Sequence, residues 1–197
     1  MKRSCLVLLT GILAGYALGN IKPIAILVAQ SARESSGKLA DGEAMVFTNE
    51  QLEKMYPPAD KSGQLPSGNP TTNLAWEPNY RLALMRRAHF DPPQKNEATG
   101  ETMPYAGSEM HENKAQIYLM RGGTGSLGLG GKPMKERPGP IVDGQHGGSE
   151  LTGARDVRVK AGGIVVIPPN TWHIARPDPG QTLTYAMCHV ESRRTIP

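Results

Sequence analysis

Two short segments of the chain carry residue types that bind metal ions. The first contains Glu109, His111 and Gln116, and the second ends in His173. Side chains two residues apart on a β-strand project from the same face, so Glu109 and His111 should point together. If that face looks into a small barrel, Gln116 and His173 can complete the ligands of a divalent ion. Two histidines with one carboxylate suit iron(II), and zinc, manganese, nickel and copper remain open.

The same residues also allow an arrangement without a metal. Glu109 and His111 can form a hydrogen-bonded pair, or they can lie on an exposed strand. The residue types alone leave both arrangements open.

The spacing of the first segment resembles the first motif of the cupin family. That motif has two histidines one residue apart, followed by a glutamate and a closing glycine. In this sequence Glu109 falls on the first histidine and His111 on the second, Gln116 falls on the glutamate, and Gly123 falls on the glycine.

The second segment resembles the second cupin motif. Gly162, Pro168 and His173 match that motif, and Asn170 replaces a glycine. Asparagine tolerates the positive φ of a tight turn, so the chain can still deliver His173 to the next strand. The likeness spans roughly residues 76–190 and implies a jelly-roll fold, a double-stranded β-helix. It also implies an enzyme such as a dioxygenase, isomerase or lyase, among which the fold does not choose.

Two departures from the family pattern affect the chemistry. Glu109 brings a negative charge that a neutral imidazole lacks. Gln116 would bind a metal only weakly, through its amide oxygen, so it suits an exchangeable position or a hydrogen bond to another ligand.

Composition and periodicity independently favour an all-β fold. The chain has 23 glycines and 17 prolines but only 5% aromatic residues, which suits short strands joined by turns. Apolar runs predict strands, several of them too apolar to have a solvent-exposed face. These runs cover residues 81–85, 116–120, 163–167 and 182–187.

The chain divides into three parts along its length. Residues 1–29 form a leader, residues 30–75 a mostly irregular segment, and residues 76–197 the cupin β-barrel. Within the irregular segment we predict one short helix over 49–55, capped by Thr48 with Gln51 in the capping-box position. Pro57 and Pro58 should stop that helix.

The leader has the pattern of a secretory signal. Lys2 and Arg3 precede an apolar run that reaches Leu18, and small residues follow it. A second apolar patch ends at Ala29, so cleavage there, or an uncleaved membrane anchor over residues 5–29, is the alternative. Lys22 interrupts the run, which argues against one clean transmembrane span and favours cleavage. We therefore expect an exported protein, periplasmic or extracellular, with no stable membrane insertion after cleavage.

Removing the leader changes two further expectations. Without Lys2, Arg3 and Lys22 the formal charge falls from +4 to +1, so no nucleic-acid partner is predicted. Cys188 is then the one remaining cysteine, which excludes an intramolecular disulfide and predicts a buried, inert thiol.

Several residues outside the motifs are candidates for substrate contact. Tyr118 and Trp172 can line the pocket, although strand alternation turns one of them outward, and His146 lies in a long connection that can reach the barrel mouth. Arg86 and Arg87 should project to opposite sides of a strand, which leaves at most one basic group for an anionic substrate, and solvent exposure is favoured for both. His89 and His189 have no motif context and are expected to be structural or exposed.

Three hypotheses about function follow. The first is an exported cupin that binds a divalent metal through Glu109, His111, His173 and optionally Gln116, and transforms a small organic molecule. The second is a non-catalytic binding protein for a small molecule or a metal. The third is an interaction module that docks through a dimer interface. We expect a homodimer with a small-molecule ligand.

Overall fold

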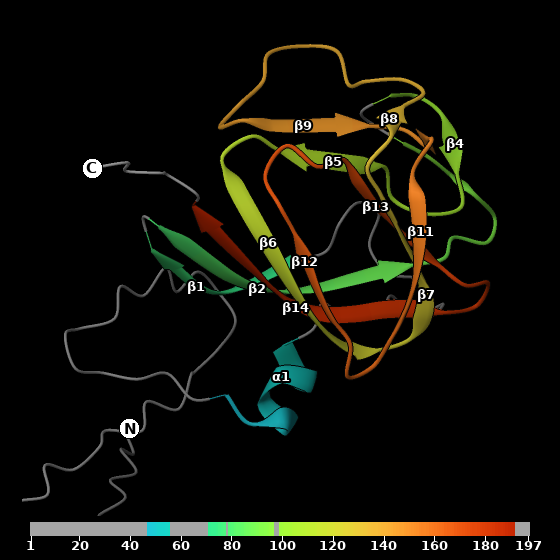
Figure 1. The fold of residues 1–197 in the computed structure, drawn as a ribbon. Helices are drawn as coiled ribbons and strands as arrows, with labels where there is room; N and C mark the ends of the chain where they lie inside the picture. Colours follow the sequence, from blue (N-terminus) through green and yellow to red (C-terminus); the bar gives the residue numbers. More distant parts are fainter. Residues whose placement is uncertain (1–46, 56–70, 78, 97–98, 192–197) are drawn as a thin grey trace, which may run out of the picture.

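The computed structural model describes residues 47–55, 71–77, 79–96 and 99–191. Two five-stranded antiparallel sheets face each other and enclose most of the core (Figure 1). The first sheet has the strand order β1-β2-β14-β6-β12, comprising Thr71–Glu77, Tyr80–Ala88, Thr182–Glu191, Lys114–Gly122 and Ile164–Ile167.

The second sheet has the order β11-β7-β13-β5-β9. Its strands are Arg155–Lys160, Thr124–Leu129, His173–Pro177, Ser108–His111 and Gln145–Gly148. Two small two-stranded sheets complete the described fold: β8 (Lys132–Pro133) with β10 (Leu151–Thr152), and β3 (Gln94–Lys95) with β4 (Thr102–Met103). The predicted double-sheet, all-β fold is confirmed.

Strand alternation decides which side chains enter the space between the sheets. On β14, Leu183, Tyr185, Met187 and His189 are buried, and the residues between them are less so. Since side chains alternate between the two faces of a strand, the four buried residues point into the barrel.

All four predicted strands are present as β2, β6, β12 and β14. The expectation that several lack a solvent-exposed face is wrong for β12, in which Ile164 is 68% and Val166 62% exposed. The strand lies at the edge of its sheet and keeps only alternate residues inside. The first sheet also begins earlier than expected, with β1 at Thr71.

The short helix α1 spans Asn49–Met55, as predicted. The capping box is formed, because Thr48 N donates to Gln51 Oε1 at 2.7 Å and Gln51 N donates to Thr48 Oγ1 at 3.2 Å. Apolar side chains of α1 and of Phe47 pack on the outer face of the first sheet, against Leu74 and Leu84. The predicted stop at Pro57 and Pro58 lies outside the described residues.

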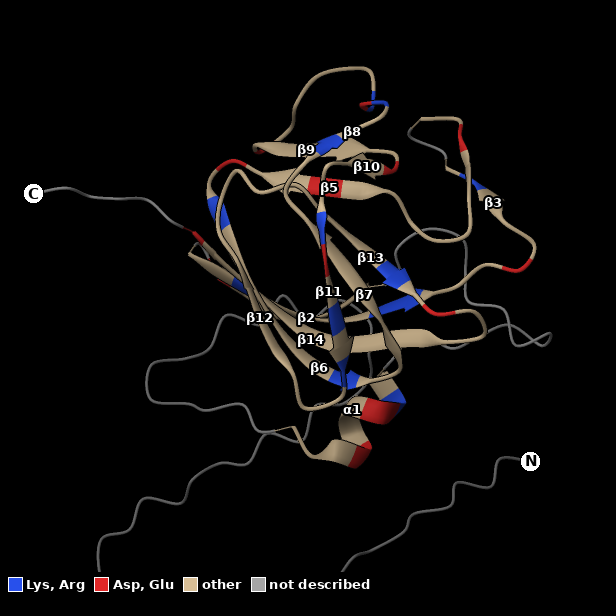
Figure 2. Ribbon diagram, turned by 45° about the vertical axis from the view of Figure 1, so that its right-hand side comes forward, with Lys and Arg blue, Asp and Glu red and all other residues tan. Residues whose placement is uncertain are grey.

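Acidic and basic residues are interspersed along the described ribbon, and α1 carries both (Figure 2). No helix in the described part of the chain is long and apolar enough to cross a bilayer. The predicted leader, residues 1–29, lies outside the described residues. Cys188 is a partly buried free thiol, and burial raises its pKa, which agrees with an inert cysteine.

Candidate metal centre

Glu109, His111 and His173 converge at the start of β13 and along β5. His173 lies opposite Glu109 in the β13–β5 register, and His111 follows Glu109 by two residues on the same face of β5. One ligand atom from each of the three residues lies within 4.8 Å of the others. His111 is 5% and His173 2% exposed. The structure therefore brings these three predicted ligands together.

The turn before β13 sets the orientation of His173. Asn170 has a φ of 58°, the left-handed conformation predicted for this position, and its backbone N–H donates to the carbonyl oxygen of His111 at 2.8 Å. His173 Nδ1 lies 2.9 Å from the carbonyl oxygen of Thr171. A carbonyl only accepts, so Nδ1 carries a proton, and Nε2 is the ring nitrogen that faces Glu109. This is the tautomer that a metal-binding histidine needs.

Three buried imidazole nitrogens at this point have no hydrogen-bond partner within the described part of the protein: Nδ1 and Nε2 of His111, and Nε2 of His173. The distance from Glu109 Oε1 to His173 Nε2 is 3.4 Å, and that from Oε2 to His111 Nε2 is 3.9 Å. Leaving a buried polar atom unpaired costs about 1–3 kcal/mol. A divalent ion among these atoms would satisfy both Nε2 lone pairs, so the residues fit a metal.

The charge state of the cluster also suits a cation. Burial alone would raise the pKa of Glu109, but His173, followed by His111 and Arg87, holds the pKa of this carboxyl well below its usual range. Burial lowers the pKa of His111, and the nearby Glu109 offsets this only in part. At neutral pH the site therefore presents one carboxylate and a neutral His111.

Gln116 is buried on β6, directly behind these ligands. The Tyr118 hydroxyl donates to Gln116 Oε1 at 2.5 Å, and Gln116 Nε2 lies 2.7 Å from His189 Nε2. Gln116 Nε2 can only donate, so His189 Nε2 accepts and the His189 proton is on Nδ1. Both ends of the Gln116 amide have protein partners, and the prediction that Gln116 binds the metal stays a prediction from the sequence.

Replacing Gln116 with leucine should destabilise the protein by about 2–4 kcal/mol, because it leaves the buried Tyr118 hydroxyl and His189 Nε2 without a partner at nearly unchanged volume. Urea unfolding of the metal-free protein measures this. The matched control is Gln181→Leu, an exposed glutamine expected to change the free energy of unfolding by less than about 0.5 kcal/mol. Equal effects of the two substitutions would contradict the buried hydrogen bonds.

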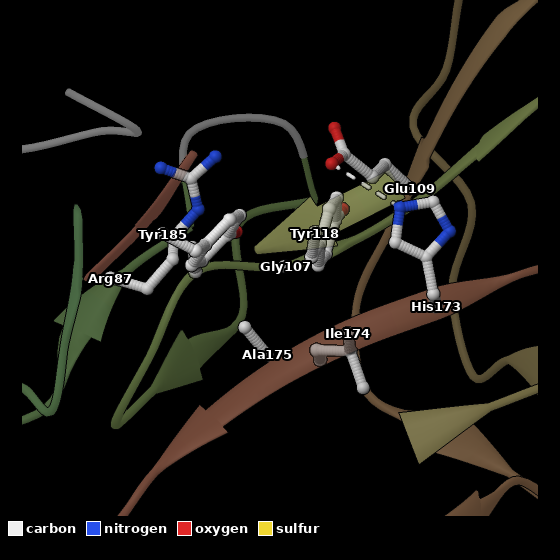
Figure 3. A pocket seen from close by; sticks show the side chains of 9 residues that line it. Arg87, Gly107, Glu109, Tyr118, His173, Ile174, Ala175 and Tyr185 are labelled. Atoms are coloured by element: carbon white, nitrogen blue, oxygen red, sulfur yellow. Dashed lines mark ion pairs between the residues drawn. The ribbon is translucent and has the colours of Figure 1, made fainter. Parts of the chain in front are cut away.

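A small inner pocket lies beside Glu109 and His173, with Tyr118, Tyr185 and Arg87 along its wall (Figure 3). Its volume of about 10 Å³ is close to that of one water molecule. The stacked rings of Tyr118 and Tyr185, with centroids 4.4 Å apart, separate the Arg87 end of the pocket from His173. Any group that reaches Glu109 and His173 from this side must be about the size of water.

A larger pocket of about 330 Å³ opens at the mouth of the barrel. His111 and His189 belong to its lining, with ring centroids 4.7 Å apart. The candidate centre is therefore reached from two sides, with Glu109 and His173 facing the inner pocket and His111 facing the mouth.

The three predicted substrate contacts are separated in the structure. Tyr118 lines the inner pocket, whereas Trp172 and His146 lie next to each other, with ring centroids 6.0 Å apart, and line neither of these two pockets. His146 lies opposite Met110 on the neighbouring strand, so it projects from the face opposite to Glu109 and His111. Its Nε2 pairs with Glu112 Oε1 at 2.9 Å.

Two residues at the site were not expected from the sequence. Arg87 is 5% exposed and lines the inner pocket, so the prediction that it faces solvent is wrong. His189 is 8% exposed and contacts His111. A signal was present for both, because each continues an alternating inward series, Ala83-Met85-Arg87 on β2 and Tyr185-Met187-His189 on β14.

The buried His189 predicts a pH dependence of the metal-free protein. Burial, followed by the proximity of His111, lowers the pKa of His189 from 6.5 to about 3. Below pH 6.5 the unfolded chain binds a proton that the folded chain excludes, so stability is complete above this pH and is lost as the pH falls towards 3. We expect a loss of about 2 kcal/mol between pH 7 and pH 5, measured by urea unfolding, and a smaller loss for His189→Gln. An unchanged slope in His189→Gln would contradict the assignment.

Comparison with known proteins finds similar solved structures. No family model and no curated protein matches the sequence. An uncharacterised protein with a double-stranded β-helix domain from Klebsiella pneumoniae is similar over 77% of this chain and 93% of its own, at 12% identity and a TM-score of 0.47.

Two further solved structures are similar over less of the chain. A cupin protein from Bacteroides fragilis covers 61% of this chain and 73% of its own, at 10% identity and a TM-score of 0.35. The Streptomyces nucleoside dehydratase Pac13 covers 63% and 70%, at 14% identity and a TM-score of 0.37. At these identities the likeness concerns the fold alone.

The arrangement of the strands agrees with the resemblance seen in the two sequence motifs. The strands that carry Glu109, His111 and His173 belong to one sheet, and the strand that carries Gln116 belongs to the sheet facing it. With these two five-stranded antiparallel sheets around one core, the chain has the cupin fold, a double-stranded β-helix.

Proposed function

We propose that this protein is a metal-binding cupin that holds one divalent ion through Glu109, His111 and His173 and uses it to bind and transform a small organic molecule. The observation that carries the proposal is the convergence of one carboxylate and two buried imidazoles whose Nε2 atoms have no hydrogen-bond partner among the described residues. Three protein ligands leave coordination positions for water and substrate. When bound, such an ion would act as a Lewis acid or activate oxygen.

The chain's own residues prepare this centre in three ways. The Thr171 carbonyl fixes the His173 tautomer, and Asn170 ties the turn before β13 to the backbone of His111. The stacked Tyr118 and Tyr185 rings limit the inner side to about one water molecule. A ligand larger than water must therefore approach through the mouth pocket.

A non-catalytic binding protein is the second candidate. It is favoured by the hydrogen bonds beside the triad, since the Tyr118 hydroxyl already donates to Gln116 and His189 Nε2 already accepts from it. Both groups already form hydrogen bonds to Gln116 and would have to break them to exchange a proton with a substrate. A general acid or base would have to come from elsewhere in the mouth pocket.

Metal content separates these candidates from an interaction module. We expect about one equivalent of divalent metal in purified residues 30–197 and almost none in the double variant His111→Ala and His173→Ala. Equal metal in the two preparations would eliminate the site. Turnover that needs both the metal and the intact ligands would favour the enzyme, and ligand binding without turnover would favour the binding protein.

Export and dimer formation are further parts of the proposal. Export rests on the leader sequence, and mass spectrometry of the mature protein should find cleavage near residue 19 or 29.

A homodimer is supported by exposed apolar side chains on the outer face of β6 and β12: Leu119 at 45%, Ile164 at 68% and Val166 at 62%. Light scattering of the unsubstituted protein should give twice the monomer mass. The double variant Ile164→Lys and Val166→Lys should give the monomer mass.

A further inference from the structure

The mouth pocket is built from strand ends that meet at one edge of the barrel. The β1–β2 hairpin contributes Trp76, Tyr80 and Arg81, the start of β6 contributes Lys114, and the end of β14 contributes His189. In Figure 1 these ends of β1, β2, β6 and β14 lie together, away from β11 and β7. The volume of the mouth pocket, about 330 Å³, lies at the lower end of the range for small-molecule sites.

The floor of this pocket joins it to the candidate metal centre. His111 is one of the three metal-binding candidates and also lines the pocket. His189 lies beside it, and its Nε2 is occupied by Gln116, so its remaining ring proton is on Nδ1. A ligand that fills the pocket therefore meets the ion on the side of His111.

The wall carries charged side chains of both signs: Arg81 and Lys114 are basic, and Glu77, Asp143 and Glu191 are acidic. Lys114 forms an ion pair with Asp143. Arg81 Nε donates to Asn73 Oδ1 at 2.7 Å, and its guanidinium lies 5.1 Å from the centre of the Trp76 ring. An ionic ligand would have to compete with these contacts. A neutral ligand with several hydroxyl groups can add hydrogen bonds to the same side chains without breaking the pairs.

Trp76 supplies the apolar part of the wall. The residue is 56% exposed, although its neighbours Leu74 and Ala75 are buried. Arg81 lies directly opposite Trp76 in the β1–β2 register, and the contact between them fixes the ring at the edge of the pocket. An exposed aromatic ring held in place beside hydrogen-bonding groups suits a ligand with one apolar face and many polar atoms at its rim.

We propose that the mouth pocket binds a neutral, polyhydroxylated ring of monosaccharide size, with its C–H face on Trp76 and a hydroxyl directed at the ion beside His111. This inference rests on the proposed metal centre and names the class of its ligand. In this arrangement Arg81 and Lys114 donate hydrogen bonds to the sugar hydroxyl groups, and Asp143 accepts one.

Saturation-transfer NMR and calorimetry on the cobalt(II)-loaded protein test the inference. The probes are D-glucose, D-galactose and D-ribose as neutral rings, D-glucarate as a dianion and L-glutamate as a monoanion with an ammonium group. We expect binding of at least one neutral sugar, a change in the cobalt absorption spectrum when it binds, and weaker binding of both ions. No sugar binding, or tighter binding of glucarate or glutamate, would overturn the inference.

Two matched tryptophan variants test which indole ring contacts the sugar. Trp76→Leu should weaken sugar binding about tenfold, because leucine offers no ring face to the C–H groups of the sugar. Trp172→Leu, which removes the other tryptophan of the chain, should leave it unchanged. Loss only in Trp172→Leu would overturn the inference. Cobalt titration of the same samples separates the two proposals: a protein that binds cobalt but no sugar refutes the ligand class alone, and one that binds no cobalt refutes the metal centre.

Discussion

Replacing Glu109 with glutamine should weaken divalent-metal binding more than about a hundredfold. Glu109 is the anionic member of the candidate triad, with its oxygens 3.4 Å from His173 Nε2 and 3.9 Å from His111 Nε2. Glutamine keeps the size of the side chain but offers only a neutral amide oxygen, a much poorer ligand for a cation. Loss of a hydrogen-bonding partner of a ligand already costs 10–100-fold in metal affinity, and loss of a charged ligand should cost more.

Glu112→Gln is the matched control for Glu109→Gln. Glu112 lies three positions further along the chain, and its Oε1 pairs with His146, away from the triad. Competition with a fluorescent chelator gives the metal affinity of each variant, and thermal unfolding without metal shows whether each still folds. Similar metal affinities for Glu109→Gln and the unsubstituted protein would exclude the Glu109 carboxylate as a ligand. A large loss of metal affinity in Glu112→Gln would show that the metal binds near Glu112 instead.

The second large effect is expected at Gly123, where the chain leaves β6 in one sheet and enters β7 in the other. Its φ is 75°, and a Cβ atom there would lie 2.1 Å from the carbonyl oxygen of Thr182. That oxygen belongs to the backbone at the start of β14 and cannot turn away. Gly123→Ala should therefore destabilise the protein by more than about 3 kcal/mol, the combined cost of left-handed backbone and overpacking.

Gly130→Ala separates the two causes. Gly130 has nearly the same φ, 76°, but a Cβ atom there would meet nothing within 4 Å. Its expected cost is only that of the left-handed backbone, about 1–2 kcal/mol. Urea unfolding of both variants measures the difference, and equal free energies of unfolding would show that the contact with Thr182 relaxes.

Features governed by neighbouring residues were predictable from the sequence. The helix α1 has the predicted bounds because Thr48 and Gln51 define its first turn locally. Asn170 takes the predicted positive φ because one tight turn alone sets the backbone conformation at this position. The convergence of Glu109 and His111 follows from their spacing of two on one strand.

Features that depend on which strands become neighbours were not predictable. The register of β6 against β14 places His189 opposite Gln116, and this pairing joins residues 73 positions apart. The exposure of Ile164 follows from the position of β12 at the edge of its sheet, which its own apolar sequence does not reveal. Arg87 differs in kind, because the alternation along β2 points its side chain inward while its charge favours solvent, and the charge was given more weight.

The packing of α1 determines where a shortened form of this protein can begin. Leu52 and Met55 cover Leu74 and Leu84 on the outside of the first sheet, and Arg121 on β6 forms an ion pair with Glu53. A recombinant fragment starting at residue 71 would keep every strand that the structure describes, yet it would expose that apolar surface to water. Such a fragment should aggregate at concentrations that the longer chain tolerates. Expression designs for crystallography should therefore retain Phe47 and everything after it.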